Sequence, residues 1–341
     1  MYRFHVDNCS KTAVYKQIID EFETAIGTGE LKSGDMLPSM NALATELDIS
    51  METVKKAYSF LRRKGLVDAQ QGKGFFVADR SEKAKLSVLF LLDKLSTYKQ
   101  ETVNAFLNEI GGDIESNILI FNQNIDLFEY YIDQIVGKYD YYIISPHFPL
   151  DASVQSRAVK GLRRFPFQKL IIIDRPMPDL QGQYGAIYQD YATDTYECFT
   201  FHRQEFANVR RINIITLESS LYGSLIQFGV ERFCKENGII CNCGKEAGTI
   251  EQGDVFVMLN SQLDSGLITL VRKARQENMK VGKDYFIISY NESPIDEVVL
   301  DGLTTISTDF ANMGLEAARM IKDRQMRKMH NDFRMIRRAT F

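Results

Sequence analysis

Several apolar runs in residues 86–341 are each followed directly by polar side chains that could bind a small molecule. Ligands of open α/β sheets bind outside the carboxyl ends of the strands, so we expect these side chains to gather in one cleft. Carboxylate, amide and guanidinium groups bind sugar hydroxyls, and a tyrosine ring can cover the apolar face of a sugar. The pattern therefore predicts a cleft that binds a small molecule, and these groups would suit a sugar. The candidate residues are Asp93, Lys94, Ser145, His147, Asp174, Arg175, Asn260, Tyr290, Asn291 and Glu292, with Tyr98 and Tyr222 as further aromatic candidates.

Two of these candidates have a second interpretation. Asp174 and Arg175 could instead form an ion pair that bridges two lobes of the protein. His147 follows Ser145 and Pro146, and a loop histidine at this position could have no role in binding. The sequence does not decide between these interpretations and the ligand-binding one.

A second candidate site lies in the first eighty residues, where positive charge is concentrated. Residues 55–80 hold seven Lys and Arg against two Asp, although the whole chain has a net charge of −4. A local basic patch on a mildly acidic protein is typical of a surface that docks on phosphate. The net charge argues against a protein that coats nucleic acid over its whole surface. The same run of charges could also be an ordinary solvated helix face.

The apolar periodicity of this amino-terminal part predicts three helices and a β-hairpin. Ser39 and Ser50 are suited to cap the second and third helices. Residues 67–70 and 75–78 are two short extended runs, which Gly72-Lys73-Gly74 joins. Such an arrangement is a winged helix-turn-helix, whose third helix can enter the major groove of DNA while the hairpin reaches the neighbouring groove or backbone. A small helical bundle with a hairpin is the alternative.

From residue 86 onward, apolar runs alternate with amphipathic segments. Near-continuous apolar strands with helical crossovers are typical of parallel sheets that are covered on both faces. The region is long for one sheet, so we expect two α/β lobes. The charged segment 79–85 is the expected domain boundary. The strand-like runs are Val88–Leu92, Ile118–Phe121, Tyr141–Ile144, Leu170–Ile173, Ile212–Leu217, Val255–Leu259, Tyr285–Ser289 and Leu303–Ile306, with a weaker run at Ala186–Tyr188.

The amino-terminal part resembles the GntR family of winged-helix transcription factors. The resemblance rests on Leu37-Pro38-Ser39, Thr53-Val54, Lys64-Gly65-Leu66-Val67 and the run 72–77, which keep the family's order and spacing. It implies a DNA-binding domain over residues 1–80 and disfavours the helical bundle. The residues that we expect near DNA are Ser39, Asn41, Ser50, Met51, Glu52, Thr53, Lys55, Lys56 and Lys73.

The carboxyl-terminal part resembles the effector domain of lac-repressor-type regulators. The resemblance rests on Asp174-Arg175-Pro176, Asn260-Ser261-Gln262, the run 281–294 and the run 303–310. It implies the periplasmic-binding-protein fold over residues 86–341, in which two lobes with parallel sheets enclose a ligand. Two ranges form each expected lobe: about 86–188 and 309–328 in lobe 1, and about 190–307 and 330–341 in lobe 2.

This second resemblance also implies three ligand contacts. Positions that correspond to Asn260, Asn291 and, roughly, Ser224 help to bind ligand in the lac-repressor family. That family often has Asp in place of Asn291 and Arg in place of Ser224. The identity of the ligand is therefore not carried over.

Composition and motifs narrow the class of protein further. The first thirty residues are too charged for a signal peptide, and no run of about eighteen apolar residues could span a membrane. Five cysteines are an odd number, and we expect reduced thiols without a metal role. The segment 238–245 has the wrong spacing for a phosphate-binding loop, and His-Glu-x-x-His and Gly-x-Ser-x-Gly are absent from the sequence. We therefore expect a cytoplasmic protein that is not an enzyme and needs no cofactor.

Together these observations predict a homodimeric transcriptional regulator, in the commoner arrangement a repressor, that binds a roughly palindromic DNA operator. Its effector would be a small molecule, a monosaccharide or a derivative of one. The sequence leaves two other classes open. One is a carbohydrate-active enzyme that uses the same cleft, and the other is a dimeric DNA-binding protein that needs no ligand.

Asn41 and Met51 depart from the GntR family, which usually has arginine at both positions. Arginine reads guanine through two hydrogen bonds, whereas asparagine prefers adenine and methionine offers an apolar contact to the thymine methyl group. We therefore expect an operator richer in A·T pairs than the family norm, and Asn41→Arg should shift the preferred site. Selection from a pool of random duplexes measures that preference. The same consensus for both proteins would contradict this role of Asn41.

Overall fold

The computed structural model describes residues 4–7, 10, 12–70, 72–78, 85–112, 114–216, 220–259 and 265–341. The chain forms two compact units, unit 1 over residues 1–85 and unit 2 over residues 86–341. Asn260, one of the expected ligand contacts, lies outside the described residues, as does most of the expected domain boundary at 79–85.

Unit 1 is a winged helix-turn-helix, as predicted. Its elements are α1 (Val14–Thr28), β1 (Met36–Leu37), α2 (Met40–Glu46), α3 (Met51–Arg63), β2 (Val67–Gln70) and β3 (Gly74–Val77). The strands form an antiparallel sheet in the order β1-β3-β2, of which the hairpin β2-β3 was expected and the two-residue β1 was not. The three helices bury their apolar stripes against one another, with Phe22, Leu43 and Leu61 in the core. The Tyr58 hydroxyl donates a 2.7 Å hydrogen bond to the Pro38 carbonyl and so ties α3 to the start of α2.

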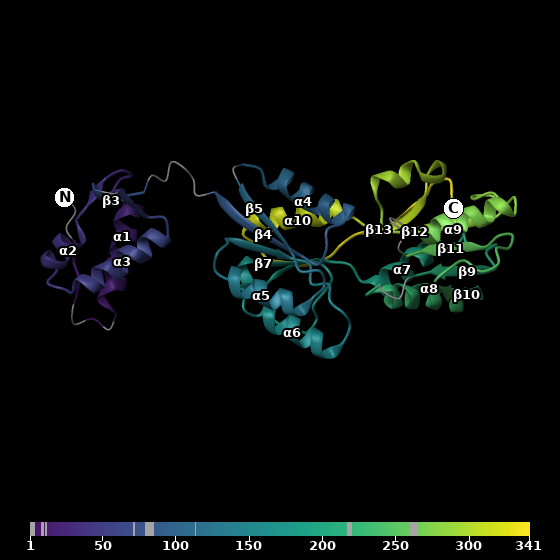
Figure 1. The fold of residues 1–341 in the computed structure, drawn as a ribbon, viewed down its shortest axis with the longest axis horizontal. Helices are drawn as coiled ribbons and strands as arrows, with labels where there is room; N and C mark the ends of the chain where they lie inside the picture. Colours follow the sequence, from purple (N-terminus) through teal and green to yellow (C-terminus); the bar gives the residue numbers. More distant parts are fainter. Residues whose placement is uncertain are drawn as a thin grey trace. The chain divides into compact units, whose positions relative to one another are not determined.

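Unit 2 consists of two α/β lobes (Figure 1). The strands of lobe 1 are β4 (Leu86–Leu92), β5 (Ile114–Ile120), β6 (Tyr141–Ile144), β7 (Leu170–Asp174), β8 (Gly185–Tyr188) and β14 (Lys328–His330). Its helices are α4 (Thr97–Ile110), α5 (Ile125–Ile135), α6 (Ala152–Leu162) and α10 (Phe310–Asp323). The sheet is parallel throughout, in the order β14-β8-β7-β6-β4-β5. Its core has two layers, because α4 and α10 cover one face and α5 and α6 the other.

Lobe 2 repeats this plan. Its strands are β9 (Arg211–Ile215), β10 (Ile240–Gly244), β11 (Val255–Met258), β12 (Phe286–Tyr290), β13 (Thr304–Thr308) and β15 (Phe333–Ile336). Its helices are α7 (Tyr191–Phe201), α8 (Gly223–Asn237) and α9 (Ser265–Gln276). The strand order is β10-β9-β11-β12-β13-β15, and α7 and α8 cover one face while α9 covers the other.

Lobe 2 differs from the expected pattern at both edges of its sheet. β15 runs antiparallel to β13, because the chain enters this edge after returning from lobe 1. β10 was not expected, since Asn242 and Gly244 interrupt its apolar character and most of the strand is exposed or half-buried. The interior strands are parallel, as predicted.

The chain crosses between the lobes three times, after β8, after β13 and before β15. Asn331, on the third crossing, is buried and hydrogen-bonded to the other two. Its backbone N–H donates to the Tyr188 carbonyl at 2.7 Å, and its Nδ2 donates to the Asp309 carbonyl at 2.7 Å. One asparagine therefore ties all three crossing segments into a single hinge.

Gly314 allows α10 to pass close to α4. A Cβ atom built on Gly314 would lie 2.0 Å from the Thr102 carbonyl oxygen and 2.8 Å from the Phe106 nitrogen, both of which are backbone atoms. We expect Gly314→Ala to lower the free energy of unfolding by about 1–3 kcal/mol, the usual cost of overpacking. Urea unfolding of the full chain measures this loss. Gly248→Ala is the matched control, because no atom of the described residues lies within 4 Å of a Cβ atom there. Equal losses in both variants would contradict the close helix contact.

Candidate nucleic-acid interface and ligand-binding cleft

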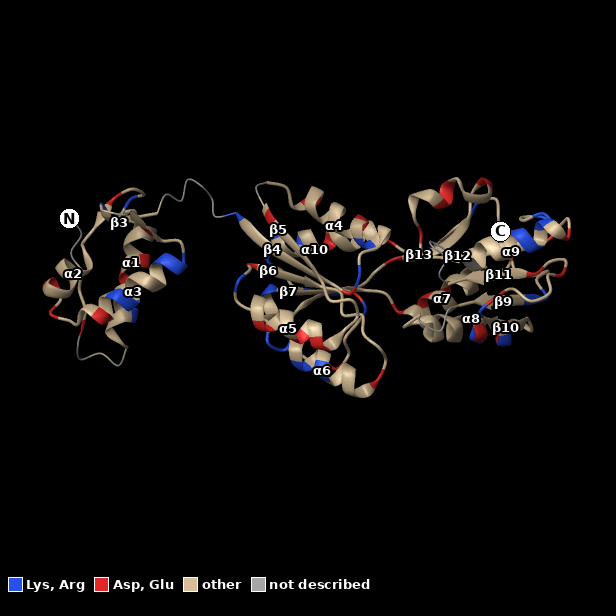
Figure 2. Cartoon of the chain, viewed as in Figure 1, with Lys and Arg blue, Asp and Glu red and all other residues tan. Residues whose placement is uncertain are grey.

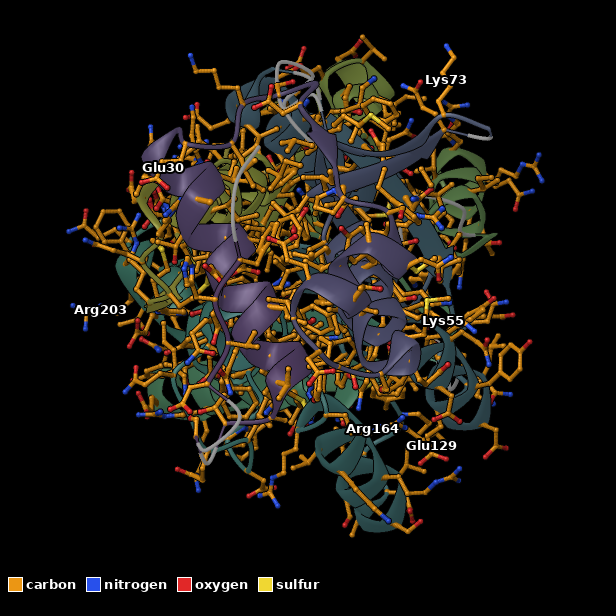
Figure 3. All side chains as sticks on the ribbon, turned by 90° about the vertical axis from the view of Figure 1, so that its left-hand side faces the viewer. Glu30, Lys55, Lys73, Glu129, Arg164 and Arg203 are labelled. Atoms are coloured by element: carbon orange, nitrogen blue, oxygen red, sulfur yellow. The ribbon has the colours of Figure 1, made fainter. Side chains whose placement is uncertain are left out.

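The start of α3 exposes a row of side chains. Met51 is 48% exposed, and Glu52 and Lys55 are exposed beside it. The Lys55 ammonium lies 4.0 Å from the Glu52 carboxylate, a distance typical of a weak surface pair. Figure 2 shows Lys and Arg residues along α3. Figure 3 labels Lys55 and Lys73 on the same side of the view, and both side chains are exposed.

Ser39 and Ser50 cap α2 and α3, as their positions predicted. Ser39 Oγ accepts a 3.1 Å hydrogen bond from the Ala42 N–H, and Ser50 Oγ accepts one of 3.2 Å from the Thr53 N–H. The Ser50 and Thr53 hydroxyls are also 2.8 Å apart and hydrogen-bonded. Both serines fix where a helix begins, so a phosphate contact would be additional to this structural role.

The three remaining DNA-binding candidates have different surroundings. Asn41 is exposed in the first turn of α2, and Lys73 is exposed at the tip of the hairpin. The Lys56 ammonium lies 4.0 Å from the centre of the Tyr15 ring, where a cation–π interaction holds it against α1. Asn41 and Lys73 are therefore accessible to DNA, whereas Lys56 already has a partner within unit 1.

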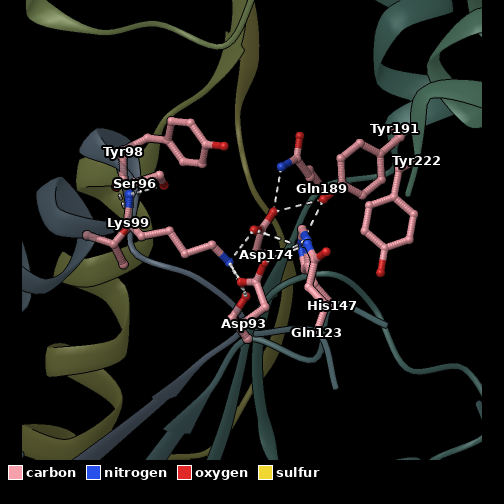
Figure 4. A network of polar contacts seen from close by, with 12 residues as sticks. Asp93, Ser96, Tyr98, Lys99, Gln123, His147, Asp174, Gln189, Tyr191 and Tyr222 are labelled. Atoms are coloured by element: carbon pink, nitrogen blue, oxygen red, sulfur yellow. Dashed lines mark hydrogen bonds and ion pairs between the residues drawn. The ribbon is translucent and has the colours of Figure 1, made fainter. Parts of the chain in front are cut away.

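A buried group of charges lies at the carboxyl ends of β4, β6 and β7 (Figure 4). The Lys99 ammonium, which comes from α4, is 2.6 Å from Asp93 Oδ1 and 3.0 Å from Asp174 Oδ2. It also contacts the Ser145 hydroxyl. The Lys99 side chain is 3% exposed, so its charge is compensated by these partners in place of water.

His147 and Asp174 extend this group toward lobe 2. His147 Nε2 is 2.8 Å from Asp174 Oδ2, and its Nδ1 is 3.7 Å from Asp93. Gln189 Nε2 donates to Asp174 Oδ1 at 2.6 Å, and the Tyr191 hydroxyl donates to the same oxygen at 3.1 Å. We call Asp93, Lys99, His147 and Asp174 the charged floor.

The carboxyl groups of the charged floor are ionised. Burial alone would raise the pKa of Asp174, but the charges of His147 and Lys99 outweigh it and hold this pKa well below its usual range. Burial alone would also raise the pKa of Asp93, but Lys99 and His147 lower this pKa by more, so it lies below its usual value. Desolvation alone would lower the pKa of Lys99. The two carboxylates raise this pKa by more than burial lowers it, so the side chain remains an ammonium ion.

Tyrosines from lobe 2 face the charged floor. The Tyr222 hydroxyl bridges to lobe 1, where it accepts a 3.0 Å hydrogen bond from the Phe148 N–H and donates one of 3.1 Å to the Phe148 carbonyl. The Tyr191 ring stacks on Tyr222 with centroids 5.0 Å apart. The Tyr290 hydroxyl donates to Gln189 Oε1 at 3.3 Å. On the opposite wall, Tyr98 stacks on Phe310 at 4.7 Å.

Between these groups lies a cavity of about 170 Å³ that both lobes line. One water occupies about 30 Å³ in the liquid, so the space suits a small ligand. Asn291 Oδ1 is buried there and has no hydrogen-bond partner among the described residues. The lining residues from the expected set are Lys94, Tyr98, His147, Asp174, Tyr222, Tyr290 and Asn291.

The other expected ligand contacts lie elsewhere. Asp93 and Ser145 are fully buried and hold Lys99. Arg175 donates to Gln155 at 2.7 Å and lies over the Tyr222 ring, so its partners differ from those of Asp174. Ser224 is exposed on α8 and is not among the described residues that line the cavity.

Lys99, Gln189, Tyr191 and Phe310 line the cavity and were not among the expected contacts. For Lys99 the sequence does contain a signal. It falls on the buried stripe of α4 with Thr102, Val103 and Phe106, at spacings of three, four and seven residues. A lysine on an apolar helix face must have a buried partner or a path to solvent, and here its partners are Asp93 and Asp174.

The described residues contain no cluster of metal-ligating side chains, since no group of three or more His, Cys, Asp or Glu side chains within them could hold a metal ion. The same ranges contain no helix of the length and apolarity needed to cross a membrane. Cys198 and Cys234 are buried free thiols, and Cys243 is an exposed one.

Comparisons with known proteins link unit 1 to DNA-binding regulators. Residues 14–77 match the family described as bacterial regulatory proteins, gntR family. The HTH-type transcriptional repressor YtrA of Bacillus subtilis is 28% identical over 121 residues, which are 32% of this chain and 93% of YtrA. The uncharacterized HTH-type transcriptional regulator YhcF of the same organism is 31% identical over 102 residues, 30% of this chain and 81% of YhcF.

Unit 2 is similar in fold to solved regulators of another type. A dimeric Lac repressor with an 11-residue carboxyl-terminal deletion superposes with a TM-score of 0.57 at 15% identity, over 75% of this chain and 98% of that one. The transcription regulator CcpA of Lactococcus lactis gives 0.55 at 14% identity, over 75% and 99%. At these identities the likeness establishes the fold of the two lobes.

The charge balance at Lys99 makes a prediction about pH. Because the folded pKa of Asp93 and of Asp174 is lowered, these groups contribute stability above their unfolded pKa of about 4, and that stability is lost as the pH falls through the folded values. In Lys99→Met the carboxyls are buried without this cation, which raises their folded pKa. The variant should therefore become more stable as the pH falls from 7 to 5.

We expect Lys99→Met to lose about 3–5 kcal/mol of unfolding free energy at pH 7, the cost of an uncompensated buried charge, and less at pH 5. Urea unfolding at both pH values measures the difference. Lys94→Met is the control, because Lys94 is an exposed lysine five residues earlier. A loss in Lys99→Met that is the same at pH 5 and pH 7 would show that the charge of Lys99 is not what stabilises the site.

Proposed function

The chain belongs to the gntR family of bacterial regulatory proteins, and from this premise we propose that it is a transcriptional repressor whose affinity for DNA depends on a small sugar or sugar derivative. Unit 1 binds the operator, and the cavity in unit 2 binds the effector. A homodimer brings two copies of unit 1 to two half-sites, so the operator is roughly palindromic.

The cavity between the lobes is the observation that carries this proposal. A sugar has hydroxyl edges and apolar faces, and the cavity has a polar floor with Asp174 and His147 and aromatic walls with Tyr98 and Tyr222. Since both lobes line it, a ligand bound there contacts both and favours their closed arrangement. An effector can shift an equilibrium between two arrangements by as much as its affinity differs between them.

On DNA, α3 enters the major groove with Met51, Glu52 and Lys55 toward the bases. The exposure of these side chains at the start of the helix supports this orientation. Asn41 approaches from the first turn of α2, and Lys73 contacts the phosphate backbone from the hairpin. Phosphate contacts fix the register of the protein and base contacts provide its sequence preference.

Fluorescence anisotropy of the full chain on a duplex selected from a random pool tests this function. We expect one of a set of sugars to weaken the DNA affinity by about 5–150-fold, the usual range of allosteric coupling, and to be recovered unchanged. A duplex affinity that no sugar alters would leave a DNA-binding protein without a sensor. Conversion of the sugar into product would identify an enzyme instead.

In the same assay, Lys73→Ala should weaken binding to all duplexes alike and reduce the slope of log K against log salt by about 1. The control is Lys32→Ala, which removes an exposed lysine elsewhere in unit 1. A loss of affinity confined to one base position would assign Lys73 to base reading and contradict the phosphate contact.

A further inference from the structure

The ammonium of Lys99 has no hydrogen-bonding capacity left for a ligand. An ammonium has three donor hydrogens, and Lys99 Nζ has three acceptors: Asp93 at 2.6 Å, Asp174 at 3.0 Å and the Ser145 hydroxyl. These acceptors follow three neighbouring strands, β4, β7 and β6, so the arrangement is fixed by the sheet. A phosphate or carboxylate on a ligand would therefore find this cation already occupied.

Beside the floor, the cavity presents one kind of group that a ligand can donate to. Asn291 Oδ1 is a buried acceptor without a partner among the described residues, and a sugar hydroxyl can donate to it. The Asp174 carboxylate also lines the cavity, but both of its oxygens are already bonded within the protein, so it contributes its negative charge and no free acceptor. The oxygens of a phosphate or carboxylate can only accept, and they would add negative charge where the low local dielectric strengthens repulsion.

Two helix N-termini at the cleft are also closed to anions. Tyr191 and Phe310, the first residues of α7 and α10, line the cavity. A helix N-terminus is an ordinary binding site for phosphate. Here the cap residues Asp190 and Asp309 place their own carboxylates on backbone N–H groups of the first turn. α8, by contrast, begins at Gly223 without a side-chain cap from the described residues, and Lys94 lines the cavity as an exposed lysine whose charge is screened by solvent. An anionic ligand would have to be held at one of these two places.

We propose that the effector is an uncharged polyhydroxy sugar and that the charged floor excludes sugar phosphates and sugar acids. This proposal rests on the function argued for the cleft and narrows it to one chemical class. Asp174 is the main determinant, because it lines the cavity and also holds Lys99. The selectivity against anionic sugars follows because the Lys99 ammonium is already paired with Asp93 and Asp174 within lobe 1.

Calorimetric titration of the full chain tests the proposal with neutral aldohexoses and aldopentoses, each beside its terminal phosphate ester and its uronic acid. We expect a neutral sugar to bind, and its phosphate and uronate to bind at least about tenfold more weakly, which is about 1.4 kcal/mol. A phosphate or uronate that binds as tightly as its parent sugar overturns the proposal and leaves the sensor function standing. Binding of none of these compounds overturns both.

Asp174→Asn tests the floor directly, since it removes one negative charge with little change of shape. We expect the discrimination against the phosphate ester to shrink by about tenfold, the effect of about 1.4 kcal/mol. Asp179→Asn is the matched control, because Asp179 is an exposed carboxylate in lobe 1 and should leave the ratio unchanged. Asp93→Asn, from beneath the cavity, provides a second variant should the first fail to fold. An unchanged ratio in the folded variant overturns the role of the floor.

Discussion

Unit 2 depends on one interaction, the burial of Lys99 between Asp93 and Asp174. Taking each of these charges out of water costs several kcal/mol, and the cost is offset only if the geometry brings them to hydrogen-bonding distance. Distances of 2.6 and 3.0 Å satisfy that condition. β6 lies between β4 and β7 in the sheet and supplies Ser145, the third partner. The carboxyl ends of three strands and the first turn of α4 must therefore be correctly placed together.

Asp174 connects this charge group to the relative position of the lobes. One of its oxygens faces Lys99 and His147, and the other accepts hydrogen bonds from Gln189 on the first crossing and Tyr191 at the start of α7. A ligand that alters the hydrogen bonding of the floor thereby alters a carboxylate that both lobes share. Asn331 is hydrogen-bonded to both of the other crossings, so the segment that leads to Tyr191 is linked directly to the other two.

Sequence alone was sufficient where the determining signal is local. Ser39 and Ser50 act as caps through bonds within three residues, and the interior strands are continuous apolar runs. The strand-end rule located Asp93, Ser145 and Asp174, but it could not tell a side chain that lines the cavity from one that supports it. Asp174 and Arg175 are neighbours in the chain, but at the end of a strand successive side chains take different directions. Asp174 therefore pairs with Lys99, whereas Arg175 bonds to Gln155. The position of Tyr191 in the cavity lining depends on how the crossing segments fold, and no local sequence pattern reveals that tertiary arrangement.

The contacts already present between the lobes set how much an effector can add. Tyr222 makes two hydrogen bonds with Phe148, and the Tyr191 hydroxyl makes one with Asp174 and one with His147. A typical hydrogen bond contributes about 0.5–1.5 kcal/mol net, so the sum over these four bonds overlaps the range of about 1–3 kcal/mol of an ordinary allosteric coupling. The balance between closed and open lobes is therefore within reach of a small ligand. Under the function proposed above, a single sugar that donates to Asn291 Oδ1 and contacts both walls of the cavity would have enough hydrogen-bonding groups to shift this balance.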